Sequence, residues 1–92
     1  MFTVYVLYSI NFDRLYIGYT GNLENRMLSH NFLGKKDWAI KYRPWIVIHT
    51  EEYPSKSEAM KRENALKGGK GREWIRNEFI VNFKENSGES GT

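Results

Sequence analysis

Residues 2–9 read Phe-Thr-Val-Tyr-Val-Leu-Tyr-Ser, and residues 15–19 read Leu-Tyr-Ile-Gly-Tyr. Both stretches are rich in β-branched and aromatic side chains, which are typical of strands. The segment between them, 11–14, contains turn-forming residues, so we expect the two strands to pair as an antiparallel hairpin. Side chains alternate along a strand, which predicts that Tyr5 and Leu7 share one face, opposite to the two valines of the first strand.

The middle of the chain contains a helix, a loop and a third strand. Thr20-Gly21-Asn22 ends the second strand and offers capping side chains, so a helix is expected over about 23–31. Residues 33–44 are polar and basic and are predicted to form a loop. The apolar run from Trp45 to Thr50 predicts a third strand that is covered on both faces.

Two helices are expected in the last third of the chain. Ser55 and Glu58 are spaced as a capping box, in which the serine caps the helix and the glutamate reaches back. The helix should continue to Lys67, where two glycines end it. A last helix is expected over about 72–83.

The resulting order is β-β-α-β-α-α, which predicts an α+β fold with a three-stranded antiparallel sheet flanked by helices. A length of 92 residues suits one domain, and we expect it to occupy residues 1–84. Residues 85–92 contain no apolar side chain and are expected to be disordered.

The chain is basic, with 14 lysines and arginines against 11 acidic residues. The bases concentrate in segments 35–43 and 56–76, which fits either a solvated surface or a face that binds phosphates. Charge alone does not choose between these interpretations. The longest apolar run, Trp45 to Ile48, is too short to span a bilayer, and the residues at the start of the chain are not expected to act as a secretory signal. The absence of cysteine is compatible with the reducing cytoplasm, where we expect the protein to be.

Glu63 is the most informative single residue. Helical spacing places it on one stripe with Ala59 and Leu66, and a carboxylate beside core residues is costly unless a cation or hydrogen bonds satisfy it. The alternative is an ordinary surface ion pair with Lys67, four residues on.

Four further residues have the chemistry of a phosphodiester-cleaving site. Tyr5 and Tyr16 lie on paired strands and are able to meet across the sheet. Arg26 and His30 are one helical turn apart, and an arginine there stabilises charge on a phosphate. Taken singly, the tyrosines also fit simple packing, and the Arg–His pair also fits a solvated helix face.

The joint pattern resembles the GIY-YIG endonuclease superfamily. Thr3-Val4-Tyr5 and Leu15-Tyr16-Ile17-Gly18 resemble the paired motif that names the family. Leu23-x-x-Arg26-x-x-x-His30 and Ser57-Glu58-Ala59-x-x-x-Glu63 resemble its two helical motifs. The segments Lys41-Tyr42-Arg43-Pro44-Trp45 and Glu63-Asn64-x-Leu66-Lys67 resemble its small single-domain bacterial branch, and the resemblance covers roughly residues 2–80. The chain departs from the family by reading Thr-Val-Tyr in the first motif and by placing Tyr19 where several family nucleases have a lysine.

The resemblance implies a metal-dependent endonuclease that hydrolyses phosphodiester bonds, with DNA as the expected substrate and repair or recombination as the expected setting. Glu63 would bind one Mg²⁺ or Mn²⁺ ion. Tyr5 would be the general base, with Tyr16 hydrogen-bonded nearby, and Arg26 would clamp the phosphate. His30 would relay a proton or hold the phosphate.

Binding of the nucleic acid is assigned to basic residues outside this group. They are Lys35, Lys36, Lys41, Arg43, Lys67, Lys70 and Arg72. The last three belong to a glycine-rich segment, 67–72, which fits a phosphate-binding loop or simply a helix end followed by a turn. Trp38 and Trp74 are candidates for stacking on bases, although core packing suits Trp74 better.

Two rival functions fit the same residues. The chain is either a nucleic-acid-binding module with weak or no catalysis, or a nuclease subunit that needs a protein partner to recognise its substrate.

Overall fold

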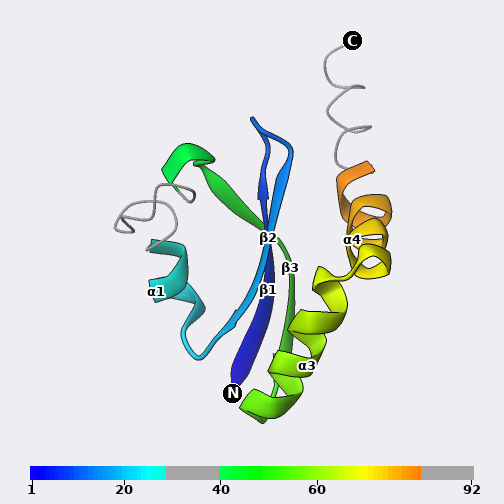
Figure 1. Ribbon diagram of the computed structural model, residues 1–92. Coiled ribbons are helices and arrows are strands. Elements are labelled where there is room, and N and C mark those ends of the chain that lie inside the picture. Colours follow the sequence, from blue (N-terminus) through cyan, green and yellow to red (C-terminus); the bar gives the residue numbers. More distant parts are fainter. Residues whose placement is uncertain (29–39, 82–92) are drawn as a thin grey trace.

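The computed structural model describes residues 1–28 and 40–81 of the chain. Its centre is an antiparallel sheet of three strands, β1 (Phe2–Ser9), β2 (Arg14–Thr20) and β3 (Trp45–Tyr53), in the order β2-β1-β3. Helix α1 lies on one side of the sheet and helices α3 and α4 lie on the other (Figure 1). The observed order of elements and the antiparallel sheet confirm the predicted α+β fold.

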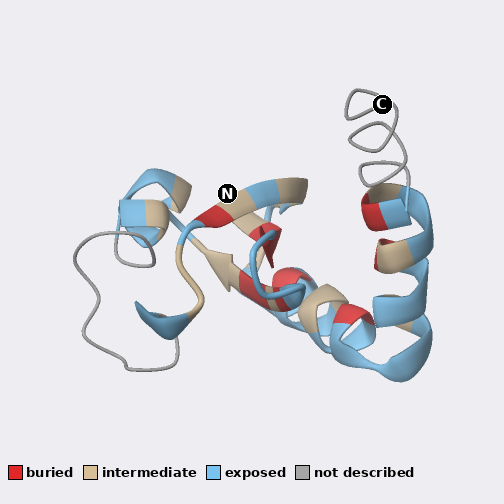
Figure 2. Ribbon diagram, turned by 90° about the horizontal axis from the view of Figure 1, so that it is seen from above, coloured by how far each residue is buried: buried red, intermediate tan, exposed pale blue. Residues whose placement is uncertain are grey.

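One face of the sheet forms the larger core. Val4, Val6 and Tyr8 of β1 point to this face and are buried, as the alternation of the strand predicts. They pack under α3 (Lys56–Lys67), α4 (Gly69–Ile75) and a π-helical turn, η2 (Arg76–Ile80). Figure 2 shows that the buried positions of these helices are on the side that faces the sheet.

The opposite face forms a smaller aromatic core. Tyr5 and Leu7 of β1 and Trp45 of β3 are buried there. Leu23 and Met27 of α1 (Leu23–Leu28) pack against them, so α1 is attached to the sheet through two side chains one helical turn apart.

The hairpin turn between β1 and β2 is tied to the end of the described chain. Asp13 has a positive φ of 54°, a conformation that aspartate tolerates better than most residues. Its carboxylate accepts hydrogen bonds from the Tyr8 hydroxyl at 2.8 Å and from Arg76 at 3.1 Å. Arg76 belongs to η2, so one turn residue joins the first hairpin to the last helix.

The corner between α3 and α4 explains one of the glycines in segment 67–72. A Cβ at Gly71 would lie 2.4 Å from the carbonyl oxygen of Ala65 and 2.6 Å from Cα of Leu66. Only glycine allows α4 to pack so closely against the end of α3. Arg72 strengthens the corner, since its Nε–H donates to the Lys67 carbonyl at 3.1 Å.

Three element boundaries differ from expectation. β3 extends to Tyr53, and Val47 is exposed, so the prediction of a strand covered on both faces is wrong. The last helix begins at Gly69 rather than near residue 72. It then continues as a π-helical turn, which places Ile75 and Ile80, five residues apart, together in the core.

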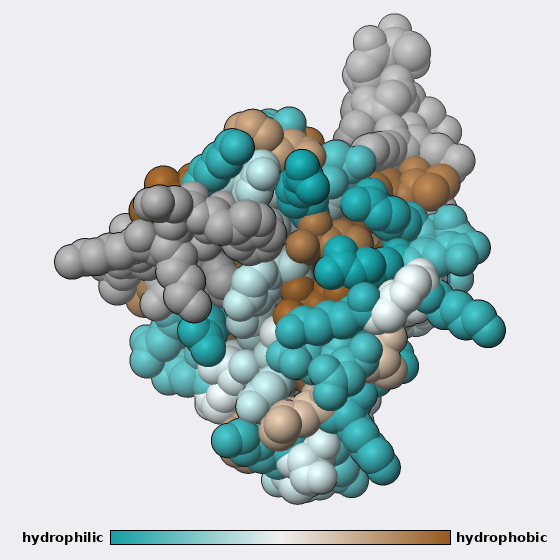
Figure 3. Space-filling view, viewed as in Figure 1, coloured by the Kyte–Doolittle hydropathy of each residue, from teal (hydrophilic) through white to brown (hydrophobic). Residues whose placement is uncertain are grey.

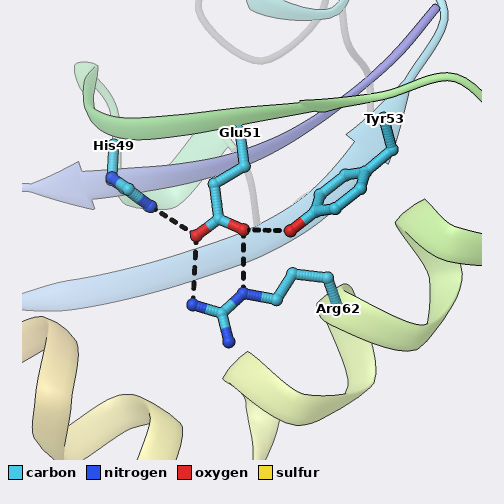
Figure 4. A network of polar contacts seen from close by, with 4 residues as sticks. All are labelled: His49, Glu51, Tyr53 and Arg62. Carbon is cyan, nitrogen blue, oxygen red and sulfur yellow. Dashed lines mark hydrogen bonds and ion pairs between the residues drawn. The ribbon is translucent and has the colours of Figure 1, made fainter.

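A polar network holds α3 against β3 (Figure 4). The carboxylate of Glu51 on β3 accepts two hydrogen bonds from Arg62 of α3, at 2.8 and 3.1 Å. The Tyr53 hydroxyl donates to the same carboxylate, and Nε2 of His49 lies 2.7 Å from it. A bidentate arginine contact is directional as well as strong, so it fixes the rotation of α3 about its own axis.

The face seen in Figure 1 is mostly hydrophilic over α3 and α4, with apolar side chains exposed in a few patches (Figure 3). Within the described ranges, no helix is both long enough and apolar enough to cross a membrane.

Candidate active site

A hollow of about 490 Å³ opens at the outer edge of β2. The sheet contributes Tyr5, Tyr16 and Gly18 to its lining, and α1 contributes Arg26. From the other side of the sheet, α3 contributes Lys56 and Glu63. Because β2 is an edge strand, residues from both faces of the sheet are able to meet around it.

Tyr5 reaches this edge by crossing Gly18. The two residues are directly opposite each other in the pairing of β1 with β2. A Cβ at position 18 would lie 2.6 Å from the Tyr5 hydroxyl oxygen and 2.8 Å from its Cζ. The phenol therefore lies against the bare backbone of β2, and the glycine of Tyr-Ile-Gly is required for that position.

Tyr16 fixes Tyr5 from the side. The two rings are nearly parallel, with centroids 6.1 Å apart, and the Tyr16 ring meets Trp45 edge to face at 6.2 Å. Tyr5 is 1 % exposed, whereas Tyr16 is partly open to solvent. The tyrosine of the first motif is thus held rigidly by aromatic packing.

Burial raises the pKa of the Tyr5 hydroxyl well above its ordinary value, and the neighbouring Tyr16 raises it further. The positive charge of Arg26 lowers the pKa of Tyr5 without outweighing burial. In the protein by itself, Tyr5 is therefore a neutral phenol near pH 7, able to donate a hydrogen bond.

Arg26 is positioned by the cap of α1. The Asn22 side chain accepts a hydrogen bond from the Asn25 backbone N–H at 3.1 Å, and the Asn22 carbonyl accepts from the Arg26 N–H at 3.2 Å. The Asn22 N–H in turn donates to the Thr20 hydroxyl at 3.1 Å. These bonds place α1 directly after β2, so Arg26 lies beside the hollow, where its side chain is exposed.

Glu63 lies beside core residues and also forms the ion pair that the sequence offers as the alternative. Ala59 and Leu66, its neighbours on the stripe, are 0 % and 1 % exposed, and the Glu63 side chain is 16 % exposed in the hollow. Its carboxylate also forms an ion pair with Lys67, with Nζ and Oε1 3.3 Å apart. The carboxylate thus faces the hollow and already has a cation at one oxygen.

The residues of the hollow fit a single hard divalent cation with one protein ligand. Glu63 is the only carboxylate among the described residues that line the hollow, and it offers the oxygen atoms that Mg²⁺ prefers. The described part of the chain holds no group of three or more histidine and carboxylate side chains that would form a cage. Water and a substrate phosphate would therefore supply most of the ligands of such an ion.

The structure brings four of the five predicted catalytic residues to one hollow: Tyr5, Tyr16, Arg26 and Glu63. His30 lies outside the described residues, as do Lys35, Lys36 and Trp38. The roles assigned to all these residues stay predictions.

The remaining basic residues lie away from the lining of the hollow. The Lys41 ammonium lies 5.6 Å from the Tyr42 ring centroid, and Arg43 is half-buried in the segment before β3. Lys70 is exposed on α4, and Arg72 is also exposed although it donates to a backbone carbonyl. Their contacts with nucleic acid stay predictions.

Trp74 is 38 % exposed and packs edge to face on Phe79 and His49.

Lys56 lines the hollow but was not among the predicted site residues. Its position in the sequence contained a usable signal, since it is seven residues before Glu63 and therefore on the same stripe of the helix.

Comparison with known proteins identifies the family. A model of the GIY-YIG catalytic domain matches residues 1–77. A UPF0213 protein of Staphylococcus haemolyticus is 42% identical over 55 residues, which is 60% of this chain and 67% of that protein. A UPF0213 protein of the archaeon Natronomonas pharaonis is 41% identical over 64 residues, which is 70% of this chain and 74% of that protein.

No solved structure matches the chain significantly. The family match covers the hairpin, α1 and α3, which carry all the residues of the hollow. It indicates a nuclease domain, for which nucleic acid is the substrate. The chain belongs to the GIY-YIG family.

Proposed function

We propose that the chain is an endonuclease that hydrolyses DNA phosphodiester bonds with one Mg²⁺ or Mn²⁺ ion bound to Glu63. The observation that carries the proposal is the convergence of two tyrosines, an arginine and a carboxylate, from both faces of the sheet, on one hollow at the edge of β2. Each of these residue types has a separate task in phosphodiester hydrolysis.

Arg26 binds the phosphate and stabilises the negative charge that develops on it. Glu63 would hold the ion, which when bound would supply further charge stabilisation at the phosphate and the leaving oxygen. Tyr5, held by Gly18 and Tyr16, positions the attacking water. As general base it would first give its own proton to solvent in the hollow and would then accept the proton of the attacking water. Positive charge close to Tyr5 favours that loss, because Arg26 already lowers the pKa of its hydroxyl.

The substrate we propose is branched or nicked DNA, in repair or recombination and in the cytoplasm. The hollow is open at the edge of a sheet, so a distorted strand is able to enter it. Reading the sequence of an intact duplex would instead require a helix or a β-ribbon inserted into the major groove.

The experiment is a cleavage assay on branched, nicked and linear DNA in Mg²⁺, Mn²⁺ or EDTA. We expect cleavage only with metal, and a loss of about 100-fold or more in Glu63→Gln, because one preorganised charge contact is worth that much. Glu52→Gln is the matched control: it removes one carboxylate from an exposed position of β3 outside the hollow. Cleavage that resists EDTA and survives Glu63→Gln would contradict the proposal.

One observation favours a second function. Lys67 already forms an ion pair with Glu63, with Nζ 3.3 Å from Oε1, so this carboxylate has a counter-ion without a metal ion. A nucleic-acid-binding module that does not cut, or that cuts only with a protein partner, fits this state. Binding of the same DNA molecules without cleavage under every metal condition would establish it.

A further inference from the structure

Lys56 is a second cation at the hollow, and it comes from the wall opposite Arg26. It is the first residue of α3 and is exposed, and it lines the hollow together with Glu63. Among the residues that the structure describes, neither Lys56 nor Arg26 forms an ion pair. The positive charges of Lys56 and Arg26 are therefore available to a ligand in the hollow.

The position of Lys56 is unfavourable for the helix itself. The first turn of a helix carries partial positive charge, so acidic residues stabilise it and a lysine there is repelled. Glu58 and the Ser55 cap supply the stabilising contacts of this turn, with the Glu58 N–H donating to Ser55 Oγ at 3.2 Å. Lys56 thus adds nothing to the stability of α3, which points to a role in binding.

The spacing between Lys56 and Glu63 indicates which phosphate the lysine meets. Seven residues of α-helix span about 10 Å along the axis, and both side chains lie on the same stripe. Successive phosphates of one strand of a DNA duplex are about 3.4 Å apart along its axis. A strand that runs along α3 with its cleaved bond at Glu63 therefore presents a phosphate to Lys56, and this phosphate is two or three nucleotides from the cleaved bond.

The local charges agree with this assignment. Glu63 is already paired with Lys67 at 3.3 Å, so it does not neutralise Lys56. Tyr19, which also lines the hollow, offers a phenol where a lysine would offer a cation. The Lys56 ammonium, which has no ion pair among the described residues, suits the negative charge of a backbone phosphate.

We propose that Lys56 binds a backbone phosphate two or three nucleotides from the cleaved bond and thereby seats the strand across the hollow. The inference rests on the proposed nuclease function, and it adds the direction in which the strand runs along α3. Lys56 acts on binding of the strand rather than on the reacting atoms.

The test measures binding of a fluorescent nicked DNA duplex by anisotropy at several salt concentrations, in EDTA so that no cleavage occurs. Lys56→Gln is compared with Lys61→Gln, an exposed lysine of the same helix that does not line the hollow. Both variants lower the net charge from +3 to +2. We expect Lys56→Gln to bind the DNA about fivefold to tenfold more weakly than the wild type. The slope of the logarithm of affinity against the logarithm of salt concentration should fall by about one phosphate contact, and Lys61→Gln should change neither quantity much.

Two further measurements separate binding from folding and catalysis. Lys56→Arg should restore affinity, and none of the three variants should melt below the wild type. In the cleavage assay, Lys56→Gln should raise KM and leave kcat nearly unchanged. Equal affinity and equal salt slopes for Lys56→Gln and Lys61→Gln would overturn the inference and leave the nuclease function intact. Wild-type binding without cleavage would overturn the nuclease function, while the comparison of the two lysines would still decide whether Lys56 binds phosphate.

Discussion

At the scale of single residues, the site depends on a glycine as much as on the catalytic side chains. The Tyr5 phenol occupies the space that a side chain at position 18 would fill, and Tyr5 lines the hollow together with Tyr16, Arg26 and Glu63. The sequence predicted the two tyrosines on paired strands. It did not predict that one ring crosses the partner strand, because that depends on a cross-strand contact rather than on the pattern within either strand.

Replacing Gly18 tests this arrangement directly. The Cβ of Gly18→Ala would lie 2.6 Å from the Tyr5 hydroxyl oxygen, so the ring must move away from the edge of β2. We expect cleavage to fall by about 100-fold, since a displacement of about 1 Å at a reacting centre has that effect. The strand itself should persist, because Gly18 does not have a positive φ. In Gly69→Ala the added Cβ meets nothing within 4 Å and lies outside the lining of the hollow, so that variant should cleave normally. Equal activity of the two variants would show that the position of Tyr5 is unimportant.

Lys56 was missed at this scale for a physical reason. A lysine in the first turn of a helix is normally solvated, so its place on the stripe of Glu63 did not by itself point to a role at the site. Glu63 was easier to identify, because a carboxylate between two buried stripe residues is costly and therefore informative.

At the scale of elements, the periodic patterns predicted most of the fold. Alternation in β1 separates its two faces correctly, and the Ser55 cap starts α3 as expected. The start of α4 at Gly69 was not predictable, because a glycine after a helix ordinarily signals its end. The π-helical turn was also missed, since a spacing of five between Ile75 and Ile80 matches neither helical nor strand periodicity.

The position of α3 depends on the network around Glu51, and its stability should depend on pH. Burial by itself would raise the pKa of Glu51, but hydrogen bonds from Arg62, Tyr53 and His49 outweigh it and hold the pKa at about 2, below its usual 4.5. A lowered folded-state pKa stabilises the protein above the usual value, and this stabilisation is lost as the pH falls from about 4.5 towards 2. The network should contribute about 2 kcal/mol to the free energy of unfolding at pH 7, after allowance for solvent screening.

The measurement is urea unfolding of the wild type and of Glu51→Gln between pH 7 and pH 2.5. The wild type should be more stable by about 2 kcal/mol at pH 7, and the difference should shrink steadily below pH 4.5. Glu52→Gln, one residue along and exposed, should follow the wild type throughout. A difference between the wild type and Glu51→Gln that is constant with pH would mean that the ion pair is not what stabilises α3.

At the scale of the whole molecule, the basic residues are concentrated in the part of the chain that the family match covers, and the last segment carries acidic residues. The family match ends at residue 77, and Ile80 is the last buried core residue of the part of the chain that the structure describes. The acidic residues of segment 85–92, Glu85 and Glu89, lower the net charge of an otherwise more basic domain. We propose that residues 1–84 form the complete nuclease domain and that segment 85–92 affects it only through charge.

A chain that ends at residue 84 tests both parts of this proposal. Losing two glutamates raises the net charge from +3 to +5, because segment 85–92 contains no other charged side chain. We therefore expect an unchanged melting temperature and an unchanged kcat, together with DNA binding about twofold tighter at low salt. That gain should disappear at about 0.3 M salt, where screening limits the range of the two lost charges to a few ångströms. A lower melting temperature would instead show that residues 85–92 pack on the core, and tighter binding that persists at high salt would show that they occupy the nucleic-acid site itself.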